Sequence, residues 1–121
     1  MYKDIKTLLD VNDCDSQKGL AMLDVLNVFS GKWKMVLICT LLRGSLRFSE
    51  IQKLIPTITP RVLSKELKEL EINGILKRTA IDSISVLSQY GLTDSAKDLE
   101  PCILQLLDWG LNHRKSNTEK Y

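Results

Sequence analysis

The feature that most constrains this chain is the helix predicted within residues 59–76, which read TPRVLSKELKELEINGIL. Leu63, Leu67 and Leu70 recur at i, i+4 and i+7, a spacing that predicts one buried apolar stripe. A second stripe, of polar donors, follows the spacing i, i+3, i+4 and i+7: Arg61, Ser64, Lys65 and Lys68. A helix buried on one side that carries such donors on the other has the shape and chemistry to enter a DNA major groove. The alternative is an ordinary solvated surface helix.

The composition favours one mostly helical globular domain. The chain has 121 residues, of which 44% are hydrophobic and 26% charged, and it contains only six Gly and three Pro. No secretory or membrane-spanning segment is predicted, because the longest apolar run, at residues 35–39, is far shorter than the ~20 residues that a span needs. We therefore expect a cytoplasmic protein.

Charge is distributed unevenly along the chain, although the formal net charge is only +2. Residues 43–78 contain eight basic and four acidic residues, a net charge of +4. Residues 1–42 are neutral overall, and residues 79–121, with four basic and six acidic residues, have a net charge of −2. A basic patch on a nearly neutral domain indicates a surface for a polyanion. Chance clustering of solvated charge is the alternative.

The cysteines and the single histidine do not predict a metal site. Cys14, Cys39, Cys102 and His113 are too widely spaced to form metal-binding pairs. Cys39 lies in an apolar segment and is expected to be a small buried side chain. No nucleophile has a catalytic sequence context and no glycine-rich phosphate loop occurs, so we expect neither a cofactor nor an enzymatic activity.

Hydrophobic periodicity predicts helices at residues 20–29, 32–43, 49–55 and 60–72, and a last helix that begins at Asp94. In the first of these, Leu23, Leu26 and Val28 or Phe29 are expected to point inward. In the second, the expected inner face consists of Trp33, Val36, Leu37, Thr40 and Leu41. The polar tail from residue 112 onward is expected to fray.

Local signals place the boundaries between these helices. Gly44 ends the helix at 32–43, Ser49 and Thr59 are N-cap candidates, and Pro60 suits a first helical position. A brief strand at 45–47 precedes two helices joined by a short turn, which is a helix-turn-helix pattern. Strands at 75–81 and 86–92, joined by a turn at 82–85, would form a wing. The predicted fold is mainly α with a small β-hairpin wing (α+β), a winged helix-turn-helix.

Several motifs between residues 20 and 110 occur together: Gly31-Lys32-Trp33, Arg47-Phe48-x-Glu50-Ile51, Thr59-x-Arg61-x-Leu63-x-x-x-Leu67-x-x-Leu70-Glu71-x-x-Gly74 and Tyr90-x-Leu92-Thr93. In this combination the chain resembles the HxlR-type winged helix-turn-helix transcriptional regulators. The resemblance implies a bacterial-type regulator that binds double-stranded DNA in a sequence-specific way, as a homodimer on a two-fold symmetric operator.

The resemblance also implies that the N- and C-terminal helices form the dimer interface. The corresponding apolar residues are Ile5, Leu8, Leu9, Leu99, Ile103, Leu106, Leu107 and Leu111. The single domain, 1–121, then comprises an N-terminal dimerisation arm (1–19), a DNA-binding core (20–93), a C-terminal dimerisation helix (94–113) and a tail (114–121). For an apolar helix near a chain end, ordinary core packing is the alternative.

The chain departs from the family pattern at two places. Many members carry a Cys-Pro pair eleven residues before the glycine of the Gly-Lys-Trp segment, and in some of them this cysteine senses oxidants or electrophiles. Here the position is Leu20, and Cys14 lies six residues earlier, so a redox role for Cys14 is kept only as an alternative. The predicted wing tip lacks the prolines and the basic residue common in the family, which implies that the helix supplies more of the binding.

The candidate DNA contacts differ in their expected roles. Arg61 lies in the first turn, the end of a recognition helix that meets base edges, and can bind both acceptors of a guanine. Its alternative is a structural pair with Glu50 or with a helix of the same domain. Lys65 and Lys68 are expected to bind phosphates. Ser64 is expected to meet the groove together with these three residues. The other candidate contacts are Arg47, Ser49, Thr59, Arg78, Ser83 and Ser85.

Two other functions stay open from the sequence. A thiol- or ligand-gated sensor regulator would change its DNA binding when its thiols are alkylated. A winged-helix module for protein–protein contact would show no salt-dependent DNA affinity.

Overall fold

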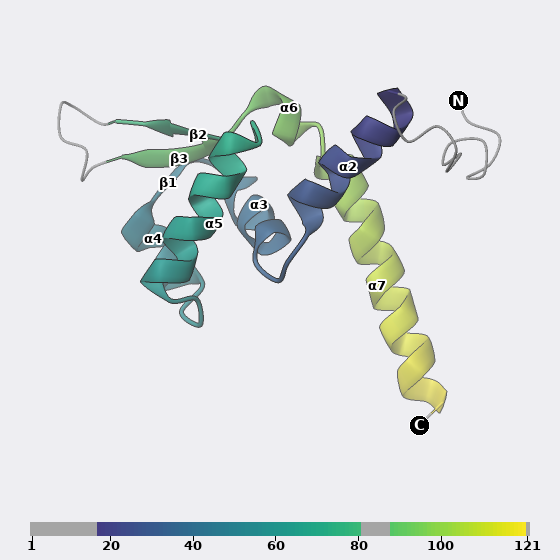
Figure 1. The fold of residues 1–121 in the computed structure, drawn as a ribbon. Helices are drawn as coiled ribbons and strands as arrows, with labels where there is room; N and C mark the ends of the chain where they lie inside the picture. Colours follow the sequence, from purple (N-terminus) through teal and green to yellow (C-terminus); the bar gives the residue numbers. More distant parts are fainter. Residues whose placement is uncertain (1–16, 81–87, 121) are drawn as a thin grey trace.

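The computed structural model of the protein describes residues 17–80 and 88–120 (Figure 1). The predictions for Ile5, Leu8, Leu9 and Cys14, and for the wing tip with Ser83 and Ser85, lie outside these residues. Along the chain the elements are α2 (Gln17–Phe29), α3 (Lys34–Leu41), β1 (Leu46–Arg47), α4 (Phe48–Leu54), α5 (Pro60–Ile72), β2 (Leu76–Thr79), β3 (Gln89–Leu92), α6 (Asp94–Lys97) and α7 (Glu100–Lys120).

The described strands form a three-stranded antiparallel sheet in the order β1-β3-β2. In the β2–β3 hairpin, Leu76 pairs with Leu92 and Arg78 with Tyr90. On the other edge of β3, Leu46 of β1 also pairs with Tyr90. The short strand and the hairpin predicted from the sequence are thus both confirmed, and the short strand proves to be the third strand of the hairpin's sheet.

The core lies where α3, α4 and α5 meet this sheet. Leu63, Leu67 and Leu70 of α5 are at most 1% exposed, which confirms the predicted apolar stripe. The other buried residues of this cluster include Leu37, Ile38, Leu41, Ile51, Ile55, Leu76 and Leu92. Because protein cores are close-packed, α5 is held in one orientation and its opposite face must point outward.

The start of α5 is capped as the sequence predicts. The Thr59 side chain accepts a hydrogen bond from the Val62 amide at 3.2 Å, and Pro60 takes the first helical position. A capping hydroxyl satisfies one of the free amides at the helix start, and a proline there loses no intrahelical bond.

The end of α5 is a Schellman motif. The amide of Ile75 donates to the carbonyl of Leu70 at 2.9 Å, and that of Gly74 donates to the carbonyl of Glu71 at 3.1 Å. Gly74 has a φ of 75°, which is left-handed backbone that glycine adopts without the Cβ penalty of other residues. The predicted stop at residues 73–74 is therefore confirmed.

Thr93 joins the end of α5, the sheet and the start of α6. Its hydroxyl donates to the Gly74 carbonyl at 2.8 Å and accepts from the Ala96 amide at 3.3 Å, so it also caps α6. Its own amide donates to the Ile75 carbonyl at 3.0 Å. The helices that follow are thus anchored directly to the C-terminal end of α5.

Four expectations about particular residues are wrong. Ser49 is not the N-cap of α4, because the helix begins one residue earlier, after Arg47, whose amide donates to Glu50 Oε1 at 2.9 Å. Leu23 and Leu26 are more than half exposed rather than inside. Cys39 is also exposed, because the buried side of α3 is formed by its leucines and isoleucine. Val36, expected on the inner face of α3, is 41% exposed.

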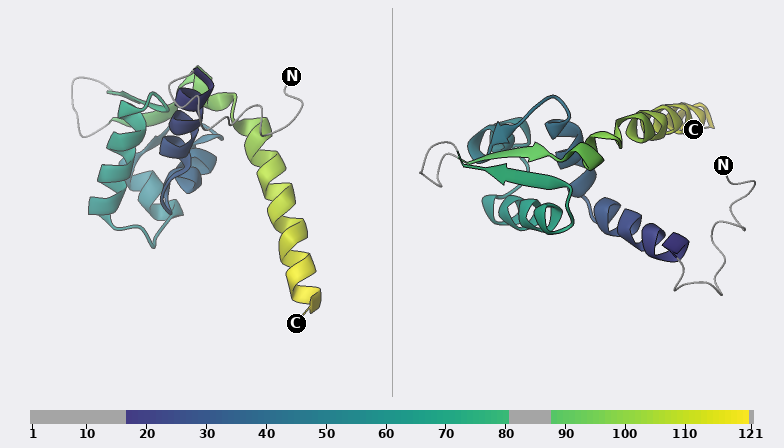
Figure 2. Two further views of the ribbon diagram at one scale, coloured as in Figure 1. Left: turned by 45° about the vertical axis from the view of Figure 1, so that its right-hand side comes forward. Right: turned by 90° about the horizontal axis from the view of Figure 1, so that it is seen from above.

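The C-terminal region also differs from its prediction. The single helix expected from Asp94 is divided into the short α6 and the 21-residue α7, and α7 continues through residues 112–120 where fraying was expected. Figures 1 and 2 show α2 and α7 projecting from the side of the molecule opposite to the β2–β3 hairpin. No helix among the described residues is long and apolar enough to cross a membrane.

Candidate nucleic-acid interface

The outer face of α5 carries the four donors predicted to meet DNA. Arg61, Ser64, Lys65 and Lys68 are all exposed, whereas the leucines between them are buried. Among the described side chains, neither Arg61 nor the two lysines forms an ion pair. The alternative pairing of Arg61 with Glu50 is therefore not formed, and Glu50 instead accepts a backbone amide. The face offers uncompensated positive charge to a ligand.

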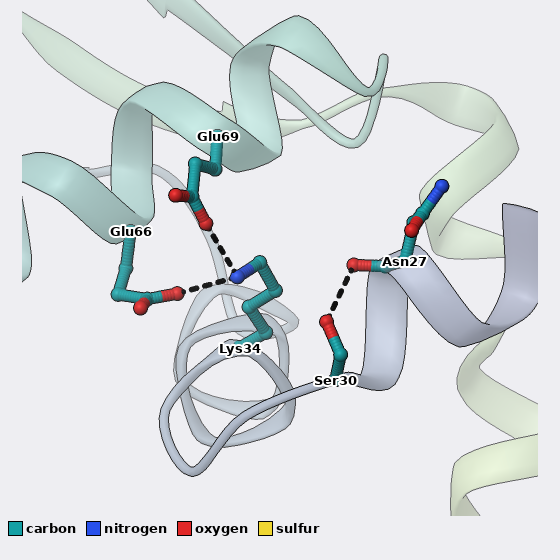
Figure 3. A network of polar contacts seen from close by, with 5 residues as sticks. All are labelled: Asn27, Ser30, Lys34, Glu66 and Glu69. Carbon is teal, nitrogen blue, oxygen red and sulfur yellow. Dashed lines mark hydrogen bonds and ion pairs between the residues drawn. The ribbon is translucent and has the colours of Figure 1, made fainter.

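Two of the three acidic residues of α5 lie on a different flank, toward α3. Glu66 Oε2 is 2.8 Å and Glu69 Oε2 is 2.6 Å from Nζ of Lys34, the first residue of α3 (Figure 3). Lys34 is only 6% exposed, and the Glu66 side chain is 13% exposed. Two of the acidic charges on α5 are thus turned away from the outer face and neutralised from within the protein.

This pairing changes the ionisation of both partners. Burial of Lys34 disfavours its charged form, but the hydrogen bonds to Glu66 and Glu69 outweigh burial and raise the pKa of Lys34 above its ordinary value. The hydrogen bond from Lys34 holds the pKa of Glu69 below its ordinary value; burial opposes this, and the charge of Lys65 acts in the same direction as Lys34. Lys34 and Glu69 therefore both stay charged at neutral pH.

The other predicted contacts surround α5. Arg47 and Ser49 are exposed at the start of α4, and Thr59 is exposed while it caps α5. Arg78 lies exposed on β2, where its Nε donates to Ser88 Oγ at 3.0 Å across the hairpin. The structure therefore brings α4, α5 and the base of the wing together in one winged helix-turn-helix (Figure 1).

A family comparison agrees with this geometry. Residues 28–118, most of the chain, match the model of the HxlR-like helix-turn-helix family. The chain belongs to the HxlR-like helix-turn-helix family. It is a DNA-binding transcriptional regulator with a winged helix-turn-helix fold, which confirms the resemblance and the fold class predicted from the sequence.

Individual relatives of this HxlR-like protein are regulators of the same kind. The HTH-type transcriptional regulator YdeP of Bacillus subtilis is 37% identical over 100 residues, which cover 83% of this chain and 78% of YdeP. An HTH-type transcriptional regulator of Methanothermobacter thermautotrophicus is 36% identical over 113 residues, 90% of this chain and 86% of its own.

Solved structures of HxlR-like relatives share the fold. The redox regulator HypR in its reduced form has a TM-score of 0.73 and 36% identity, covering 84% of this chain and 99% of HypR. Quinone-bound YodB from B. subtilis has a TM-score of 0.67 and 28% identity, covering 76% of this chain and 97% of YodB.

The helices expected to pair subunits in this HxlR-like chain expose apolar side chains. On α7, Leu104, Leu106, Leu107, Trp109 and Leu111 are each at least half exposed. Ile103 and Leu99, named with them from the sequence, have a different environment: Ile103 is 7% exposed in the chain's own core, and Leu99 packs against that core. Leu106, Leu107 and Leu111 are the predicted interface residues that the subunit itself leaves uncovered.

Lys34 is the site residue that the sequence did not reveal. It precedes the apolar segment 35–39, and its partners lie 32 and 35 residues further along the chain. Periodicity assigns Glu66 and Glu69 to the surface of α5 but cannot show which neighbouring helix they meet. A lysine at the start of an otherwise apolar helix is the one local signal that could have drawn attention to it.

Proposed function

We propose that this HxlR-like regulator binds a two-fold symmetric DNA site as a homodimer, with α5 of each subunit in the major groove. The observation that carries the proposal is the outward quartet Arg61, Ser64, Lys65 and Lys68, anchored by buried leucines on the same helix. A basic recognition helix next to a wing is the arrangement that reads base edges and holds the backbone. Such a protein would act in the cytoplasm, where bacterial DNA lies.

The proposed roles follow from side-chain chemistry. Arg61, at the first turn of α5, can bind guanine O6 and N7 as a planar fork. Lys65 and Lys68 act on phosphates as point charges. Ser64, on the same outward face, is proposed to contact the groove. The proposed flanking contacts to the backbone are Arg47, Ser49, Thr59 and Arg78, with Ser83 and Ser85 at the wing tip.

Dimerisation is proposed through the apolar faces of α2 and α7. Leu104, Leu107 and Leu111 follow the spacing i, i+3 and i+7 on α7, and α2 exposes Leu20 and Leu23. Covering one such leucine contributes about 1.5–3 kcal/mol, so a shared face of several would hold two subunits together. Because the axis of a symmetric dimer relates its two α5 helices, the half-sites should be about one or two helical turns apart.

Selection of bound duplexes from a random double-stranded library tests this proposal. We expect enrichment of an inverted repeat, and protection of both half-sites in a footprint of the same sequence. Recovery of a single unrepeated half-site would exclude the symmetric dimer. A failure to retain any duplex at low salt would exclude α5 as a DNA-binding helix and favour a protein-contact role for the fold.

Thiol gating is a second candidate, supported by the likeness of this chain to the redox regulator HypR. The chain's own residues support it less. The usual cysteine position is Leu20, and partial burial of the thiol of the otherwise exposed Cys39 raises its pKa, which disfavours the reactive thiolate. Alkylating the protein with iodoacetamide before the binding measurement distinguishes the two: constitutive binding predicts an unchanged affinity.

A further inference from the structure

Lys34 lies at the N-terminal end of a helix, where a positive charge is least favourable. Lys34 opens the eight-residue helix α3, whose remaining residues are mostly apolar, and no acidic residue occurs in the first turn. The positive end of the helix dipole repels a cation at this position. Burial of an ammonium group adds a desolvation cost. Lys34 therefore does not serve the stability of α3 by itself, and its compensation comes from α5.

That compensation connects two helices at a defined place. The carboxylates of Glu66 and Glu69, one turn apart on α5, converge on the same Nζ from one side (Figure 3). Charged hydrogen bonds at 2.8 and 2.6 Å have narrow geometric tolerance. The contact fixes how far α5 is rotated about its own axis, and hence where its outer face points.

The contact between Lys34 and Glu69 also determines whether Lys65 is available to bind DNA. Lys65 and Glu69 are four residues apart on α5, a spacing at which side chains of opposite charge pair. Lys65 forms no ion pair with any described residue, while Glu69 is held by Lys34. Without Lys34, Glu69 would be free to pair with Lys65, and its carboxylate would lie beside the surface that meets DNA without the charge of Lys34 to neutralise it.

We propose that Lys34 is a positioning residue for DNA recognition, which holds α5 on α3 and occupies Glu66 and Glu69 so that Lys65 stays free for a phosphate. The inference rests on the proposed function of α5 and extends it to a side chain that never touches the nucleic acid.

A double-mutant cycle between Lys34 and Lys65 tests this role. The parent, K34M, K65A and K34M/K65A proteins are titrated by fluorescence anisotropy with a selected duplex and with an unrelated duplex of equal length, over a range of KCl concentrations. We expect K34M to bind both duplexes roughly tenfold more weakly, with the slope of log K against log[KCl] flatter by about 0.9, as for one lost phosphate contact. K65A should cost about tenfold in the parent but little in K34M.

Neutralising Glu66 and Glu69 should restore the DNA affinity that is lost with Lys34. In K34M/E66Q/E69Q no carboxylate remains to capture Lys65, so the affinity should return to within about threefold of the parent and K65A should again cost about tenfold. K97M, which removes an exposed lysine on α6, is the matched control and should bind like the parent. Thermal unfolding is recorded for each variant, and K34Q, which keeps a donor without the charge, replaces K34M if that protein does not fold.

The outcomes separate the inference from the proposed function. An equal cost of K65A in the parent and in the Lys34 variant overturns the role of Lys34 while leaving α5 as the DNA-binding helix. A neutral triple variant that is folded but still binds tenfold more weakly also overturns it. If the parent binds neither duplex, or if K65A is harmless in the parent, the proposed function is wrong and the inference falls with it.

Discussion

At the scale of single residues, α5 separates its charges by direction. Its buried leucines face the core, its glutamates Glu66 and Glu69 face Lys34, and its cations face outward without described ion-pair partners. The helix therefore presents a more positive face than its sequence implies, because charges of opposite sign are sorted onto different flanks. We therefore predict different effects on DNA binding for substitutions at base contacts and at phosphate contacts.

Replacing the outward residues one at a time should separate these two classes. Lys65→Ala and Lys68→Ala should each weaken binding to every duplex and flatten the dependence of log K on log[salt] by about one unit. Arg61→Ala should instead remove about 1–3 kcal/mol of discrimination at one base position. Titrations with the selected duplex and its single-base variants measure both effects. Three variants that all bind like the parent would show that the site is misassigned even though the fold is correct.

The Lys34–Glu69 pair predicts a pH dependence of stability. Because the pKa of Glu69 is lowered in the folded protein, the pair stabilises the fold above about pH 4.5, the ordinary value, and this contribution is lost as the pH falls through the folded value. The raised pKa of Lys34 places its own loss above pH 10.5. Urea unfolding between pH 7 and pH 3 should therefore show a smaller decrease in the free energy of unfolding for Glu69→Gln than for the parent. Glu71→Gln, on the same helix, controls for the loss of one carboxylate; the same pH profile for Glu69→Gln as for the parent would argue against the pair.

At the scale of elements, the predictable parts of this fold are those specified by nearby residues. Both ends of α5 were predictable because Thr59, Pro60 and Gly74 act within a turn of their own positions. The β2–β3 hairpin was predictable for a similar reason, because its two strands follow one another in the sequence. The pairing of Lys34 with α5 was not, since a contact across 32 residues depends on how two helices pack. The exposure of Leu23 and Leu26 was also missed, because an apolar periodicity does not say whether the chain itself or another molecule covers it.

The left-handed end of α5 is open to a direct test. Gly74→Ala should destabilise the protein by about 1–2 kcal/mol, since the added Cβ disfavours a φ of 75°. Apart from the adjacent residues of the chain, no atom of the described residues lies within 4 Å of the site for that Cβ, so the cost reflects backbone conformation alone. Gly110→Ala inside α7, also without a close neighbour, should instead be neutral or stabilising by up to about 1 kcal/mol. Chemical denaturation of both variants should show changes of opposite sign in the free energy of unfolding. Equal changes would mean that the measurement reports helix propensity alone.

At the scale of the whole molecule, one end carries the charge and the other carries uncovered apolar surface. The β2–β3 hairpin lies at one side of the body, and α2 and α7 leave from the opposite side (Figure 2). Exposed leucines and Trp109 gather on those two helices rather than being scattered. Several large exposed apolar side chains on the same two helices are typical of an interaction site, which supports subunit pairing at a distance from the DNA.

A charge placed on α7 should separate the subunits. Leu107→Glu is expected to weaken association at least tenfold, because burying one leucine contributes about 1.5–3 kcal/mol and a buried carboxylate adds a penalty. Sedimentation velocity should then find a monomer at concentrations where the parent is a dimer. Leu54→Glu, at another leucine more than half exposed but on α4, is the control and should leave the sedimentation coefficient unchanged. A monomeric parent would rule out the dimer.

The hydrogen bonds of Thr93 connect the helix proposed to bind DNA with the segment that leads to the helix proposed to pair subunits. Thr93 forms hydrogen bonds with three segments of the chain. It bonds to Gly74 at the end of α5, to Ile75 just before β2, and to Ala96 in α6, which leads into α7. In a paired protein, a tilt of α7 would be transmitted to the end of α5 through a few hydrogen bonds, without rearranging the leucine core. The distance between the two α5 helices of such a dimer would then depend on the hydrogen bonds of Thr93.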